Sequence, residues 1–165
     1  MTRPEAPVSL PDRAPTTFDA WVAPHLAVLS AIAVREVGEH DADDLVQETL
    51  LRGWQQQDKF DSARGSSRAF LASILYDRAR RHRTRRRPDP ELEVTHVGPV
   101  DPEHLDLERA VGTLPRRQRQ VVTLHYMAGL PIAEIAVALS ISVGSVKSHL
   151  FDARTALRTA LEETP

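Results

Sequence analysis

Apolar residues recur at helical spacing along almost the whole chain of 165 residues, and no segment alternates with the period of two that a strand requires. Hydrophobic residues make up 41% of the sequence, but aromatic residues make up only 5%. Small cores of Leu, Ile, Val and Ala fit this composition better than one large aromatic core. The pattern therefore predicts an all-α protein with two small helical domains.

A proline-rich, acidic segment divides the chain. Three prolines and a glycine interrupt the apolar periodicity between Pro88 and Asp101, and residues 88–108 carry seven acids without Lys or Arg. This composition predicts a flexible acidic linker over residues 88–106, between a first domain at 18–87 and a second at 107–161. Residues 1–17 contain four prolines and no apolar run, which predicts a disordered N-terminal extension.

The first domain is expected to contain three helices. One covers Phe18–Val37 and stops at Gly38, and a third begins near Ser66. The second starts with Asp41 as its N-cap, and its buried side carries Leu45, Val46, Leu50 and Trp54.

The second domain carries the strongest local signal, a helix–turn–helix. Two apolar-faced helices at 131–139 and 143–161 are separated by the turn Ser140-Ile141-Ser142, with Ser142 as the N-cap of the second helix. Val146 and Leu150 face inward. The first turns of a recognition helix enter the major groove and read base edges, so its outward residues are candidate DNA contacts: Ser145, Lys147, Ser148 and His149.

Charge is strongly segregated although the net charge is only −2. Residues 61–87 hold nine arginines against two acids, and most of those arginines fall between Arg78 and Arg87. Such a run repels itself unless an anion neutralises it, which favours contact with nucleic-acid phosphates. Pairing with the acidic linker, or a solvated charged tail, would also explain it.

Four acids open the second helix: Asp41, Asp43, Asp44 and Glu48. A metal site or carboxylate catalysis is possible in principle, but acids in a first turn already interact favourably with the helix dipole. The sequence has no cysteine, and its seven histidines form no i, i+4 ligand pair. We expect no metal, no cofactor and no catalytic residue.

Residues 41–54 and 58–71 resemble region 2 of the extracytoplasmic-function (ECF) sigma factors of the sigma-70 family, the subunits that direct bacterial RNA polymerase to promoters. Residues 114–119, 134–136 and 143–150 resemble region 4 of the same family. Both halves occur in the family's order, with a linker between them, across about Phe18 to Leu161.

The resemblance implies three interfaces. Core RNA polymerase, through its clamp helices, would dock on Asp43, Asp44, Gln47, Glu48 and Leu51. The −10 promoter element would be recognised and opened by Lys59, Arg64, Arg68, Arg78, Arg81 and Arg85. The −35 element would be read by the recognition helix, with the polymerase flap as a further contact of the second domain. An anti-sigma factor is another partner that the family allows.

No uninterrupted apolar run approaches the roughly 18 residues that span a bilayer, and the N-terminus lacks the apolar core of a secretory signal. We expect a cytoplasmic protein without membrane insertion. Three alternatives remain open on the residues alone: a helix–turn–helix regulator that acts without polymerase, a metal-dependent nuclease, and a sigma-like decoy that binds core polymerase without initiating.

Overall fold

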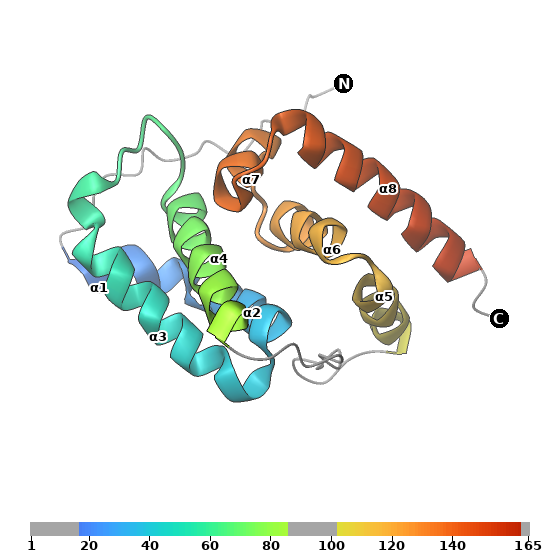
Figure 1. Ribbon diagram of the computed structural model, residues 1–165, viewed down its shortest axis with the longest axis horizontal. Coiled ribbons are helices and arrows are strands. Elements are labelled where there is room, and N and C mark those ends of the chain that lie inside the picture. Colours follow the sequence, from blue (N-terminus) through green and yellow to red (C-terminus); the bar gives the residue numbers. More distant parts are fainter. Residues whose placement is uncertain (1–16, 86–101, 163–165) are drawn as a thin grey trace, which may run out of the picture.

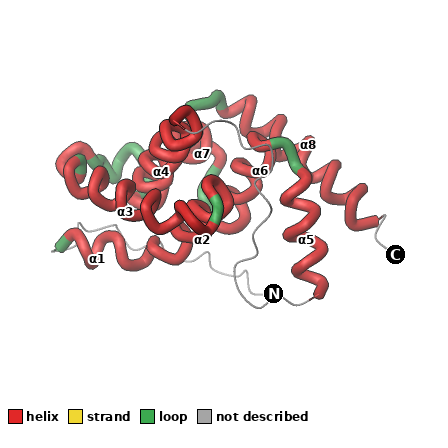
Figure 2. The backbone as a smooth tube through the Cα atoms, turned by 60° about the horizontal axis from the view of Figure 1, so that its bottom comes forward, coloured by secondary structure: helices red, strands yellow, loops and turns green. Residues whose placement is uncertain are grey.

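The computed structural model describes residues 17–85 and 102–162, and every regular element in these two ranges is a helix (Figures 1 and 2). The all-α prediction is confirmed. Residues 1–16 of the predicted N-terminal extension and residues 88–101 of the predicted linker lie outside the described residues, and Thr17 is the N-cap of α1. Helix α5 begins at Pro102, so the last residues of the segment predicted as linker are helical.

The first part is a bundle of three long helices. They are α2 (Leu26–Val37), α3 (Glu39–Gln55) and α4 (Ser67–Arg85), and each packs against the other two. A short α1 (Phe18–Val22) precedes them. Pro24 lies in a 3₁₀ turn between α1 and α2, and it breaks the single helix that the periodicity predicts. The bundle core is fully buried and includes Leu29, Ile32, Leu45, Leu71 and Leu75.

Two predictions for α3 were wrong. The helix begins at Glu39 after Gly38, so Asp41 is a buried first-turn residue and not the N-cap. Trp54 is 54% exposed, and Gly53 takes the inward position at that end of α3. A Cβ atom on Gly53 would lie 2.9 Å from Leu71 Cδ2, so a side chain there would force the fully buried Leu71 to shift. Trp54, about 100° further around the helix, is turned outward.

The stretch Phe18–Val37 is long and apolar enough to cross a bilayer, with a mean hydropathy of 1.3 over its most apolar window. The expectation drawn from uninterrupted apolar runs missed it. Within the bundle, however, Leu29, Ile32 and Ala33 of this stretch are fully buried. Their burial identifies the stretch as a core helix of the first domain.

The second part contains α5 (Pro102–Thr113), α6 (Arg116–Val122), α7 (Ile132–Leu139) and α8 (Val143–Glu162), and α5, α6 and α7 pack against α8. A π-helical segment, Thr123–Met127, extends α6. Gly129, with φ at 66°, turns the chain toward α7. The side chain of Ser142 accepts a hydrogen bond from the backbone N–H of Ser145 at 3.0 Å, which confirms the predicted N-cap of α8.

The two parts pack against each other through α4 and α7, which come from opposite halves of the sequence (Figure 1). One apolar cluster runs through both parts, from Leu71 and Leu75 on α4 to Ile135 and Leu139 on α7. The described residues therefore form two domains that share one interface.

A buried carboxylate lies at this interface. Glu36 on α2 is 7% exposed and accepts hydrogen bonds from Arg83 Nη1 at 2.9 Å and from Arg116 Nη2 at 3.1 Å. Gln120 Nε2 donates to both of its oxygens at 3.0 and 3.1 Å. Burial raises the pKa of Glu36 above its ordinary value, and the neighbouring Arg83 opposes that rise. Nearby, Arg35 donates to both oxygens of Glu108 on α5 at 2.7 Å.

We expect Glu36→Ala to lower the free energy of unfolding by about 2–3 kcal/mol, because the change leaves the half-buried Arg83 and the buried Gln120 without their carboxylate. Urea denaturation of the full chain measures the loss. Glu48→Ala, which removes an exposed acid from α3, is the matched control and should change stability by under about 0.5 kcal/mol. Equal effects of the two changes would contradict a special role for Glu36.

Candidate functional site

One candidate surface is the outward side of α3. The five residues predicted to dock a partner are all exposed there: Asp43, Asp44, Gln47, Glu48 and Leu51. Leu51 is 57% exposed, and Trp54 lies one turn further along the same helix. This side of α3 therefore presents an apolar pair next to three carboxylates, which is the composition of a small protein-binding patch. Sequence reasoning missed Trp54 because it placed this residue in the core.

The second candidate surface is the start of α8. Lys147 and Ser148 are exposed, His149 is half-buried, and Val146 and Leu150 face the core as predicted. The hydroxyl groups of Ser145 and Ser142 lie 2.8 Å apart and hydrogen bond to each other, so Ser145 is partly engaged in capping the helix. Lys147 and Ser148 are the freest of the four predicted contacts.

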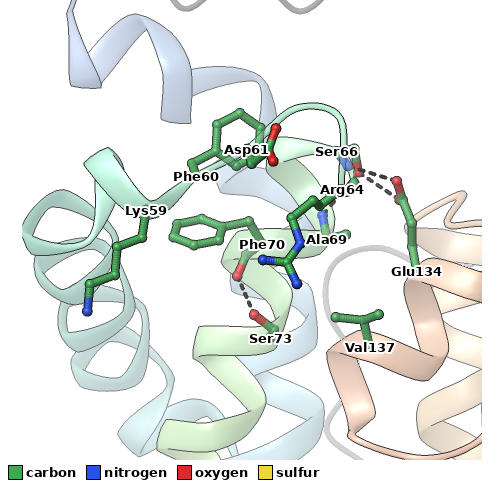
Figure 3. Close-up of a pocket in the computed structure, with 11 residues that line it drawn as sticks. Lys59, Phe60, Asp61, Arg64, Ser66, Ala69, Phe70, Ser73, Glu134 and Val137 are labelled. Carbon is green, nitrogen blue, oxygen red and sulfur yellow. Dashed lines mark hydrogen bonds between the residues drawn. The ribbon is translucent and has the colours of Figure 1, made fainter.

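The third candidate surface joins the loop before α4 to α4 itself. An aromatic cluster of Phe18, Trp21, Phe60 and Phe70 anchors this loop, with neighbouring ring centroids 5.3–5.8 Å apart. Sequence reasoning did not identify the cluster, since its members come from three separate segments. It leaves Lys59 and Arg64 exposed at the edge of the loop. Both residues line a cavity of about 170 Å³. In Figure 3 the Arg64 side chain lies between Phe70 and Glu134, and the Lys59 side chain extends outward on the other side of Phe70.

The predicted arginines differ in how they are held. Arg85 is exposed, whereas Arg81 pairs with Asp77 at 3.1 Å on the same helix. The buried Nε of Arg78 has no hydrogen-bond partner among the described residues. Arg68 is half-buried, and its Nη1 donates to the backbone oxygen of Ala128 in the second domain at 2.7 Å. Part of the cationic surface is therefore bound to protein in this arrangement.

The second domain also contacts the loop directly. The carboxylate of Glu134 on α7 accepts hydrogen bonds from the backbone N–H and the hydroxyl of Ser66, at 2.7 and 2.8 Å (Figure 3). Ser66 immediately precedes α4, where backbone N–H groups are unpaired and favour an anion. Val137, one turn after Glu134, lines the same cavity. The loop and the start of α4 are thus partly covered by the first helix of the helix–turn–helix.

No group of three or more His, Asp or Glu residues suited to a metal ion occurs in the described ranges 17–85 and 102–162. The acids of α3 are instead spread along the helix, with Asp41 buried and Asp43, Asp44 and Glu48 exposed.

Two family profiles match the chain. Residues 21–88 match Sigma-70 region 2, and residues 104–157 match Sigma-70, region 4. These spans contain the three surfaces described above: α3 and α4 in the first, and α7 and the start of α8 in the second.

Among characterised proteins, the chain is 33% identical over 151 residues to the ECF RNA polymerase sigma factor SigL of Mycobacterium tuberculosis. The aligned region covers 84% of this chain and 85% of SigL. It is 35% identical over 123 residues to the ECF RNA polymerase sigma factor SigF of Caulobacter vibrioides, covering 71% and 69%.

Two solved structures have a similar fold. CnrH, in complex with the cytosolic domain of CnrY, is 30% identical with a TM-score of 0.66, covering 90% of this chain and 89% of CnrH. RpoE of Bartonella quintana, in complex with the anti-sigma factor NepR, is 25% identical with a TM-score of 0.68, covering 90% and 98%.

Proposed function

The chain belongs to the ECF sigma factors of the sigma-70 family, non-enzymatic proteins that direct RNA polymerase to promoters, and we propose how its residues divide that work. The first domain binds core polymerase through α3 and holds the −10 element through the loop and α4. The second domain reads the −35 element through α8 and contacts the polymerase flap. Membership of this family removes the nuclease and the free-standing regulator as explanations.

The α3 patch, defined as Asp43, Asp44, Gln47, Glu48, Leu51 and Trp54, carries the polymerase-docking proposal. An exposed leucine and tryptophan on one turn of a bundle helix have no packing role, since both lie more than half outside the core. Flanking carboxylates steer such a patch toward a basic surface, and the apolar pair supplies the buried centre of the contact. The polymerase clamp helices are the proposed partner.

Reversing two charges in the α3 patch should abolish binding to core polymerase without unfolding the chain. The variant is Asp44→Arg with Glu48→Arg, because both side chains are exposed and surface changes typically alter stability by under about 0.5 kcal/mol. Pull-down with core polymerase measures binding, and circular dichroism measures folding. Asp152→Arg with Glu162→Arg, two exposed acids on α8, gives the same charge change and should bind normally. A folded patch variant that still binds core would refute the docking site.

For the −35 element, we propose that Lys147, Ser148 and His149 enter the major groove, while Ser145 contacts it at the capped end of α8. The support is their position on the first two turns of α8, where Ser148 lies opposite the buried Val146 and Leu150, Lys147 is exposed, and His149 is half-buried beside them. An imidazole and a hydroxyl can each hydrogen bond to base edges, whereas an exposed lysine also reaches phosphates.

His149→Ala should cost roughly 1–3 kcal/mol of promoter affinity and relax the preference at one −35 position. Lys147→Ala, if the lysine contacts phosphate, should weaken all −35 sequences alike. Binding of the holoenzyme to a library of −35 variants separates the two patterns. Thr159→Ala, an exposed change near the far end of α8, is the control. Unchanged affinity and preference for His149→Ala would show that another residue reads the element.

For the −10 element, we propose that the domains separate before the strand binds. Arg68 is held by Ala128, and Ser66 is held by Glu134, so two groups of the proposed −10 surface are engaged by the second domain. Lys59, Arg64 and Arg85 are exposed already, and Arg78 and Arg81 would join them along α4.

Glu134→Ala should therefore increase the affinity of the free chain for a single-stranded −10 oligonucleotide several-fold, because it releases Ser66 and weakens the domain interface. Fluorescence anisotropy measures the affinity. In the holoenzyme, where the domains would already be apart, the same change should have no effect. Glu162→Ala is the charge-matched control. An equal gain in the holoenzyme would indicate simple loss of a repulsive charge and contradict the covering role.

We also propose that an anti-sigma factor binds this chain. We further propose that the chain itself works in the cytoplasm, where core polymerase is found. The support for a regulator is the similarity to RpoE of Bartonella quintana, whose structure contains its anti-sigma factor.

A further inference from the structure

A second cavity lies between the domains, away from the loop that Glu134 contacts. It measures about 100 Å³ and is enclosed by α4 on one side and by α6 and the end of α7 on the other. Its polar lining includes four arginines: Arg80, Arg83, Arg116 and Arg117. No part of the proposed promoter or polymerase contacts uses it.

Positive charge is in excess around this cavity. Arg83 and Arg116 share one carboxylate, that of Glu36. Arg80 and Arg81 both pair with the carboxylate of Asp77, one turn before them on α4. Four lining guanidinium groups thus face two carboxylates, and one of those carboxylates is also held by a further arginine.

Arg117 is the cation without a countercharge. Its Nη1 donates to the amide oxygen of Gln120 at 3.2 Å, and no carboxylate of the described residues pairs with it. Burial lowers the pKa of Arg83; its ion pair with Glu36 opposes this fall, and the nearby Arg117 and Arg80 lower the pKa further. Arg83 is half-buried, whereas Arg80, Arg116 and Arg117 are exposed to solvent, so the cavity brings four guanidinium groups together at the surface between the two domains.

A buried hydroxyl group lies beside the same cavity. Tyr76 lines the cavity and is 6% exposed, yet its hydroxyl has no hydrogen-bond partner among the described residues. Buried polar groups are nearly always satisfied, so the hydroxyl of Tyr76 leaves one hydrogen-bond donor without a partner beside the cavity.

We propose that this cavity binds a multivalent oxyanion, the phosphate or pyrophosphate group of a small molecule, which bridges the two domains. Guanidinium groups bind phosphate oxygens through paired N–H donors, and a group with two or more negative charges matches the surplus of cations. A small anion fits because α7 closes the cavity on one side, whereas a polynucleotide would require the domains to part.

We call the arrangement in which α4 packs against α7 closed, and the arrangement with separated domains open. The ligand contacts both domains, so it stabilises their association by binding the closed arrangement better than the open one. The consequence for promoters rests on the function proposed above: an anion here would oppose the separation that exposes the −10 surface. The binding itself does not depend on that function, and the two are tested apart.

Isothermal titration calorimetry of pyrophosphate into the full chain, at constant ionic strength, tests the site. We expect saturable binding at one site. Arg117→Gln should weaken it about tenfold, since a charge-assisted hydrogen bond is lost. Tyr76→Phe should weaken it by a smaller factor. Arg158→Gln, an exposed arginine on α8 outside the cavity, removes the same charge and should leave binding unchanged.

A second arm distinguishes the source of the phosphate. A short single-stranded oligonucleotide is titrated against the same variants. Loss of oligonucleotide binding in Arg117→Gln, with no saturable pyrophosphate binding in the wild type, would assign the arginine to the DNA backbone and overturn the proposal. Equal weakening of pyrophosphate by Arg117→Gln and Arg158→Gln would also overturn it, because only net charge would then matter. Neither result bears on polymerase docking by α3.

Discussion

The contact between the two domains of this protein combines a shared apolar cluster with one buried carboxylate, that of Glu36. Glu36 lies in a helix of the first domain, and a buried carboxylate is costly unless charged and hydrogen-bonding groups surround it. The first domain supplies Arg83, and the second supplies Arg116 and Gln120. The carboxylate is therefore fully satisfied only while the domains touch. When they part, water must replace two of its three partners, and the same water then solvates the half-buried Arg83. The net cost of opening is the difference between these two effects.

The amphipathic pattern predicted most of each domain but failed where packing is closest. The inward side of α8, with Val146 and Leu150, and the N-cap at Ser142 follow from local spacing, and the structure confirms them. Trp54 and Gly53 show the limit. Periodicity assigns the large apolar residue to the core, but Gly53 takes the inward position at this point, where any added side chain would displace Leu71. The tryptophan is thereby moved to the surface, where it enlarges the apolar centre of the α3 patch.

The contacts between domains could not be predicted in this way. Glu134 and Ser66 are 68 positions apart, and Gln120 and Glu36 are 84 apart. A polar residue on the outer face of a helix looks the same in the sequence whether it meets water or another domain. Glu134 is the clearest case: its helix predicts only that it faces away from Ile135 and Leu139. The sequence did suggest that the arginine run needs an anionic partner. It offered the acidic linker as a partner within the chain, but it did not indicate that Arg83 would pair with Glu36 of the first domain.

The three surfaces differ in how accessible they are to a partner. On the proposed function, this difference sets the order in which polymerase and single-stranded DNA bind. The α3 patch and the exposed start of α8 are free while the domains are closed, whereas Ser66 and Arg68 of the −10 surface are engaged by the second domain. Core polymerase can then bind first, through α3, without any prior opening. Contacts made by polymerase with the second domain would offset the loss of the Glu36 network, because a partner shifts a conformational equilibrium only by its differential affinity for the two states. Single-stranded DNA gains access last. This order withholds part of the proposed −10 surface in the free chain, although the start of its recognition helix is exposed.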